Sequence, residues 1–275
     1  MDSILLHPLL LHLIPATIYA ALGLTYWRVA PSANKGHLRP CARVLLVIAL
    51  ASHAYVLGNT LFDGGGLNFG MAAALSLTLW LTVLIYFVES FFARLEGLLA
   101  LAMPIAAVCA FLPAVLPGHH YTDITDSWAF RAHFVVAMLA YGLFTLAALH
   151  ALMMALAERQ LHHAQLSPGM AGLPPLLTLE NLMFRLIGIA FVLLTLTVGS
   201  GVLFSEELFG KPLTFNHKTV FTIASWLLFG MLLIGRRVWG WRGRTAQRWT
   251  LAGFVCLLLA YVGTRFVLEV LLHRG

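Results

Sequence analysis

Histidine is the residue type in this chain that is best suited to carry out chemistry. Twelve histidines occur among 275 residues, of which 60% are hydrophobic and only 10% charged. A neutral imidazole ligates metal ions and can also exchange a proton near neutral pH. The sequence contains no GxSxG, HExxH or nucleotide-binding loop, and its three cysteines form neither CxxC nor CxxCH. The residue types therefore favour ligation over hydrolysis, thiol redox chemistry or covalent haem attachment.

Two histidines stand out from the others by their positions in apolar runs. His53 lies in an apolar run, about 13 Å inside its boundary at Phe62. An ionisable residue at that depth usually faces a bundle interior or a cavity, although hydrogen bonding to a neighbouring helix explains it equally well. His133 opens a later apolar run, and Ala137 and Tyr141 follow it on one helix face. Ala137 leaves room beside the imidazole for a flat ligand, although helix packing also uses small residues, and Tyr141 adds a hydroxyl.

Further candidates lie near the ends of the last two apolar runs. His217 and Lys218 head one of these runs, and His273 ends the other. Arg265 is set into the last run, four residues before Glu269, so an ion pair within one helix is the simplest explanation. Alternatively, the guanidinium binds a ligand carboxylate, for which its geometry is well suited. Lys218 is a second cation that can take this role.

The elements that must position these residues are membrane-spanning helices. A helix needs about 20 apolar residues to cross the hydrocarbon, and the apolar runs here are continuous rather than alternating. The sequence predicts an all-α, polytopic membrane helix bundle, formed by residues 1–275 as a single transmembrane domain. The expected crossings are Ile4–Trp27, Val44–Phe62, Leu67–Val88, Gly97–Pro117, Ala132–Ala157, Leu186–Ser205, Thr219–Gly235 and Trp249–Leu272.

The distribution of basic residues predicts the orientation of this bundle. Most of the 17 lysines and arginines fall in alternate connections, and the densest group is Arg236, Arg237, Arg242, Arg244 and Arg248, with Trp239 and Trp241 between them. Arginine-rich connections stay in the cytoplasm, and tryptophan favours the headgroup level. We therefore expect both termini to be periplasmic in a bacterial inner membrane. The basic residues alternate with apolar runs instead of forming one patch, which argues against nucleic acid as a partner.

Three motifs stand in the last third of the chain: NHKTVFTIASW at 216–226, GWRGR at 240–244 and LAYVGTR at 259–265. They resemble the cytochrome c assembly family of membrane proteins, which handle haem and include CcsA-like and HemX-like members, and the resemblance covers roughly 128–270. Synthetase members have a tryptophan-rich loop running into DPKETW, where Lys218 and Trp226 match the lysine and the later tryptophan. Residues 209–215 contain no tryptophan. The resemblance therefore implies a non-synthetase branch of the family.

The resemblance implies that the chain binds haem b without a covalent bond, near the periplasmic face. His133 is similar to an external haem-ligand position of the synthetase members, and a histidine also occurs in them near the position of His273. His217 stands where the family has the proline of DPK, so no role carries over to it. His53, His217 and His273 are the expected partners of His133, and Arg265 and Lys218 would face the haem propionates.

The leading hypothesis is thus a haem-handling protein of cytochrome c assembly that makes no bonds itself and is not an enzyme. Its partners would be haem, the lipid bilayer and other cytochrome c assembly or membrane proteins. The alternative is a non-haem accessory protein of a transporter or ion-tolerance system, in which the histidines serve packing or bind transition metals. A cytochrome b-like electron carrier is a weaker third reading, because only His150 lies in the inner half of the bundle.

Overall fold

Helices account for nearly all of the described chain. The computed structural model describes residues 2–28, 40–62, 67–93, 95–116, 121–122, 127–162, 174–203 and 216–267. Eight helical segments in these ranges are long and apolar enough to cross a membrane, as the sequence predicts. The first seven are α1 (Asp2–Arg28), α2 (Pro40–Leu61), α3 (Met71–Glu89), α4 (Glu96–Val115), α5 (Trp128–His162), α6 (Leu176–Leu203) and α8 (His217–Val238).

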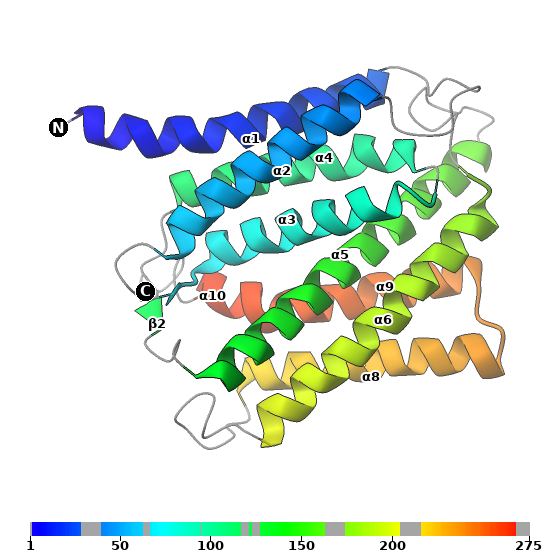
Figure 1. Ribbon diagram of the computed structural model, residues 1–275. Helices are drawn as coiled ribbons and strands as arrows, with labels where there is room; N and C mark the ends of the chain where they lie inside the picture. Colours follow the sequence, from blue (N-terminus) through cyan, green and yellow to red (C-terminus); the bar gives the residue numbers. More distant parts are fainter. Residues whose placement is uncertain are drawn as a thin grey trace.

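The eighth crossing is composite. It begins as α9 (Gly243–Leu258), continues through a π-helical turn, η4 (Leu259–Gly263), and resumes as α10 (Thr264–Phe266). The predicted third crossing begins too early, since Leu67 and Asn68 form a strand, β1, antiparallel to β2 (Tyr121–Thr122). Figure 1 shows the crossings alternating in direction, so the start of α1 and the end of α10 lie at the same end of the bundle.

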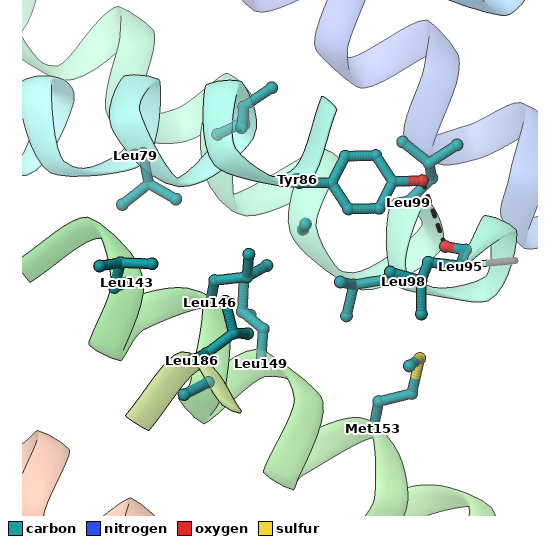
Figure 2. Close-up of a cluster of buried hydrophobic side chains, with 14 of the residues drawn as sticks. Leu79, Tyr86, Leu95, Leu98, Leu99, Leu143, Leu146, Leu149, Met153 and Leu186 are labelled. Carbon is teal, nitrogen blue, oxygen red and sulfur yellow. Dashed lines mark hydrogen bonds between the residues drawn. The ribbon is translucent and has the colours of Figure 1, made fainter. Parts of the chain in front are cut away.

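The long helix α5 lies at the centre of the bundle (Figure 1) and packs against α3, α6 and α9. On one side of it, α1 packs along α4 and α2, and α3 packs on α4; on the other side, α8 packs on α9 and α6. The core contains mostly leucine, methionine and alanine. Figure 2 shows part of it, where Leu146 and Met153 of α5 face Leu98 of α4 and the Tyr86 hydroxyl of α3 donates a hydrogen bond to the Leu95 carbonyl at 3.2 Å.

Large apolar side chains also cover much of the outside of the bundle. Val108 of α4, Val192 of α6 and Leu227 of α8 are each more than half exposed, at 64%, 59% and 57%. In water such a surface would be costly, but hydrocarbon accepts it without penalty. The exposed faces therefore are the ones that contact lipid.

A network of polar side chains joins α6, α8 and α9 at one end of the bundle, which we call the arginine end. Glu180 of α6 is 5% exposed. Its carboxylate accepts a hydrogen bond from Arg236 and another, at 2.9 Å, from the backbone N–H of Gly243, and it lies 3.7 Å from Arg242 Nε. One acidic side chain thus lies between two arginines and binds the first turn of α9.

The motif GWRGR forms the connection between α8 and α9. Gly240 and Gly243 adopt positive φ values of 66° and 53°, which glycine accepts without steric cost. The turn returns Trp241 onto the last helical residues of α8, where its ring covers Gly235 and its backbone N–H donates to the Gly235 carbonyl at 3.1 Å. Trp249 packs on the Trp241 ring with 4.9 Å between centroids. The motif therefore has a structural explanation that does not require a ligand.

The predicted boundary of the sixth crossing is wrong. The sequence assigned Glu180 to a connection and began the crossing at Leu186, whereas α6 begins at Leu176 and includes Glu180 as a buried residue. The predicted start at Leu186 left the charged residues before it in a connection, and the partner that stabilises Glu180 within the helix, Arg236, is 56 residues away in the sequence. Similarly, Glu158 lies within α5 and pairs with Arg244 at 3.3 Å.

Orientation in the membrane stays a prediction from the arginine count. A fluorescent reporter that matures only in the cytoplasm, fused after Gly275, should leave cells dark. The same reporter fused after Gly240, at the arginine end, should fluoresce, because arginine-rich connections stay inside. Fluorescence from the first fusion together with darkness from the second would reverse the assignment.

Candidate functional site

His133 lies in the second turn of α5, at the end of the bundle opposite the arginine end, which we call the His133 end. Its Nδ1 is 2.8 Å from the Ser200 hydroxyl of α6. That hydroxyl donates its own proton to the Leu196 carbonyl at 2.7 Å, so it accepts from His133 and the imidazole proton resides on Nδ1. The lone pair then belongs to Nε2. Metal-binding histidines are usually held in this way, with the second ring nitrogen donating to a fixed acceptor.

Two cations share one aromatic ring beside His133. Lys218 Nζ lies 5.6 Å from the centroid of the Tyr261 ring, and Arg265 Cζ lies 5.8 Å from it. Both distances fall within the range of cation–π attraction. The charge of Lys218 also acts on His133, and that of Arg265 acts on Lys218. Two like charges held this close make the region attractive to an anion such as a carboxylate.

Local structure explains how these cations reach the same ring. Asn216 caps α8: its side-chain oxygen accepts from the backbone N–H of Thr219 at 3.0 Å, which fixes the helix start and places Lys218 in the first turn. Tyr261 lies within the π-helical turn η4, and its hydroxyl donates to the Phe69 carbonyl at 2.7 Å. The π turn is a structure that is frequently found at functional sites.

The helix face predicted from His133 is only partly available to a ligand. Ala137 is 9% exposed, because it packs in an apolar cluster with Met138 and Phe130. The Tyr141 hydroxyl donates to the Leu257 carbonyl at 3.0 Å and thereby joins α5 to α9. A small residue does border the imidazole, but it is Gly201 of α6, where an added Cβ would be 3.6 Å from His133 Cε1.

His53 belongs to a different group, between α1, α2 and α3. It is 1% exposed, its Nε2 lies 2.9 Å from the Ser76 hydroxyl and its Nδ1 lies 3.4 Å from the Tyr19 hydroxyl. His12 interacts with it electrostatically and donates its own Nδ1–H to the Ala110 carbonyl at 2.8 Å. Both nitrogens of His53 are engaged inside the protein, so the contacts favour the packing interpretation over a ligand role together with His133.

Of the other two predicted histidines, the structure describes His217 but not His273. His217 is the first residue of α8, is exposed, and directly precedes Lys218. It therefore lies at the same end of the bundle as His133. His273 lies outside the described residues, as does Glu269, the predicted ion-pair partner of Arg265. Residues 209–215, where the tryptophan-rich loop is missing, lie outside them as well.

The structure adds Ser200 and Tyr261, which the sequence analysis did not single out. Tyr261 stands in the LAYVGTR motif, so a signal for it was present. Ser200 is a polar residue between two glycines in an apolar run, which is typical of helix packing and does not by itself indicate a partner. Only the three-dimensional contact with His133 identifies it.

The donor set suits a haem better than a bare metal ion. Within the described ranges, no three His, Cys, Asp or Glu side chains gather so that they could hold a metal ion. A haem iron needs only one or two protein ligands, because the porphyrin supplies the others. The His133 imidazole with its lone pair on Nε2, two cations for carboxylates and aromatic side chains nearby fit that requirement.

The sequence also matches known proteins along nearly its whole length. The cytochrome c assembly protein family matches residues 12–272, which extends well beyond the expected 128–270. The inner membrane protein YpjD of Escherichia coli is 30% identical over 247 residues, or 86% of this chain and 90% of that protein. A 28.8 kDa protein of Azospirillum brasilense is 29% identical over 269 residues, 96% of each chain.

A third similarity is confined to part of the chain. The cytochrome c biogenesis protein CcsA of Gloeobacter violaceus is 32% identical over 98 residues, which are 36% of this chain and 29% of that protein. With eight helices able to cross a membrane in the described part of the chain and an inner membrane protein among its relatives, the protein is a multi-pass protein of the bacterial inner membrane. By the match across residues 12–272, it belongs to the cytochrome c assembly protein family.

Proposed function

We propose that this protein binds haem b non-covalently at the His133 end and holds or passes it during cytochrome c assembly. His133 would be one axial ligand, through Nε2, and Lys218 and Arg265 would bind the propionates. The observation that carries the proposal is the hydrogen bond from His133 Nδ1 to Ser200, at 2.8 Å, which selects the ligating tautomer beside two cations.

The second axial ligand would come from the same end of the bundle. His217 adjoins Lys218 on α8, and His273 follows Arg265 in the sequence, whereas His53 is committed to Ser76. The iron supplies the affinity and the spectroscopic signature when haem is bound. The chain itself orients one imidazole and offers compensating positive charge, and we propose that it makes and breaks no covalent bonds.

The proposal predicts the haem content of three variants purified from haem-supplemented cells. His133→Ala should lose most of its haem per folded protein, because it removes an axial ligand. Ser200→Ala should keep the ligand but lower haem affinity about 10-fold, since it releases the ring from its orienting partner. His162→Ala, at the far end of α5, should match the wild type.

Absorbance of the Soret band, divided by the amount of folded protein from size-exclusion chromatography, measures this content. Full occupancy and an unaltered spectrum in His133→Ala would refute the proposed ligand. Wild-type protein with no haem at all would refute haem binding itself and favour the accessory-protein alternative.

A further inference from the structure

A second pair of ionisable side chains lies far from His133, at the arginine end, between α3 and α5. Glu89 Oε2 and His150 Nε2 face one another at 3.6 Å. The His150 side chain is 0% exposed and that of Glu89 is 11% exposed. Each of these two atoms is buried and has no other hydrogen-bond partner within the described chain. Buried polar atoms are rarely left in this condition, so the pair needs an explanation.

The tautomer of His150 is fixed by its other nitrogen. Nδ1 lies 2.9 Å from the Leu146 carbonyl, one turn earlier in α5. A carbonyl only accepts, so Nδ1 carries the proton in the neutral imidazole and Nε2 carries a lone pair. Without a further proton, this lone pair would face an ionised carboxylate across 3.6 Å, and two acceptors would repel each other in an apolar interior.

A bridging water does not resolve this contact. Two acceptors that share one water lie about 4.5 Å apart, since each hydrogen bond spans roughly 2.8 Å and the water is bent. The separation in the structure is 3.6 Å, too short for that geometry and close to a direct hydrogen bond. A proton between the two atoms converts the repulsion into a charge-assisted hydrogen bond.

Other charged and titratable groups surround the pair. Arg185 of α6 acts on Glu89 with its positive charge. On α3 itself, Tyr86 lies within electrostatic range of Glu89, and the same tyrosine is within range of Glu96 of α4 and Tyr26 of α1. One proton makes the contact favourable on either partner, because an imidazolium Nε2–H donates to a carboxylate and a Glu89 carboxylic acid donates to the neutral Nε2.

We propose that Glu89 and His150 form a buried proton-binding site, which holds one proton between Oε2 and Nε2 and joins α3 to α5. Glu89 is the last residue of α3 and is the more exposed partner, at 11% against 0%. The proton therefore exchanges through the carboxylate with the aqueous phase at the arginine end. The site uses no residue of the proposed haem site, so its test is independent of haem.

Nitrogen NMR of histidine-labelled protein in lipid nanodiscs tests the site directly. The His150 signals are assigned through the backbone of the wild type. They should show either that both ring nitrogens are protonated or that the ring is neutral and its Nε2 accepts from a Glu89 carboxylic acid. Each of these patterns places one proton in the site. His12 is the matched control, since its Nδ1 likewise donates to a carbonyl at 2.8 Å but its electrostatic neighbour is His53. A neutral His150 with a bare Nε2 would overturn the proposal.

The sign of a stability change provides a second test. In Glu89→Gln, the amide N–H donates to Nε2 of the neutral imidazole and takes the place of the proton, so the thermal unfolding midpoint should not rise. If the wild-type site held no proton, the same variant would relieve a repulsion between two acceptors, and a raised midpoint would overturn the proposal. Glu158→Gln is the control, because its partner Arg244 is 65% exposed and little change is expected.

Discussion

Replacing Glu180 by alanine should lower the free energy of unfolding by about 3–5 kcal/mol, as expected when one partner of a buried ion pair is removed. The carboxylate accepts from Arg236 and from the Gly243 N–H, and it lies 3.7 Å from Arg242. Its loss leaves the Arg236 guanidinium, 21% exposed, without its principal anion. The first turn of α9 loses an acceptor at the same time.

Thermal unfolding of the detergent-solubilised protein measures this effect, and Glu158→Ala provides the comparison. Glu158 also binds two partners at the arginine end, Arg244 at 3.3 Å and Gln247 at 2.8 Å, but Arg244 is 65% exposed. We expect at most about 1 kcal/mol from that substitution, since water replaces an exposed partner readily. Equal midpoints for the two variants would show that burial does not decide the strength of this network.

Gly235→Ala should be the second damaging substitution, through steric overlap rather than charge. A Cβ on Gly235 would overlap the Trp241 ring, nearer than real Cβ atoms approach another group. The ring cannot withdraw easily, because it stacks on Trp239 with 5.6 Å between centroids and on Trp249 with 4.9 Å. Overpacking of this kind typically costs about 1–3 kcal/mol.

The emission of the tryptophan cluster and the unfolding midpoint together report the outcome. The control is Gly188→Ala, in the middle of α6, where an added Cβ meets no atom within 4 Å. That variant should be neutral, or stabilising by up to about 1 kcal/mol, because alanine favours the helix. A Gly235→Ala protein with wild-type stability and emission would mean that Trp241 has room to move.

Hydropathy alone predicted the eight crossings, because a run of about 20 apolar residues has no stable alternative in the bilayer. It failed where a charge is neutralised by a partner distant in the sequence, as with Glu180 and Arg236. It also failed where the helix begins later than predicted, as at Leu67, whose strand pairing with Thr122 depends on a segment 55 residues later. Both errors concern long-range contacts, which local patterns do not contain.

The candidate site shows the same limit. His133, Lys218 and Arg265 were identified one at a time, by depth and charge, and the structure places them around one end of α5, α8 and α10. The contacts that these residues make with Ser200 and Tyr261 depend on how α6 and the π turn are rotated. His53 lies deeper in its apolar run than His133 does in its own, yet its rotation turns it toward Ser76 and Tyr19. The depth of a residue along a membrane crossing can be predicted from sequence. The rotation of a helix is set by its packing against neighbouring helices, which the sequence does not show directly.

The π turn at Leu259–Gly263 has a consequence for insertions and deletions. A π turn contains one residue more than an α turn, so a helical wheel drawn through the whole last crossing misplaces Arg265 relative to Trp249 by about 100°. The segment before the turn is fixed by packing on α5 and α8, and the turn itself by the bond from Tyr261 to Phe69. Removing one residue within the turn would convert it to ordinary α-helix and rotate Arg265 about the helix axis relative to α9. Arg265 would then leave the ring that it now shares with Lys218, while the packing of α9 on α5 and α8 would hold that segment in place.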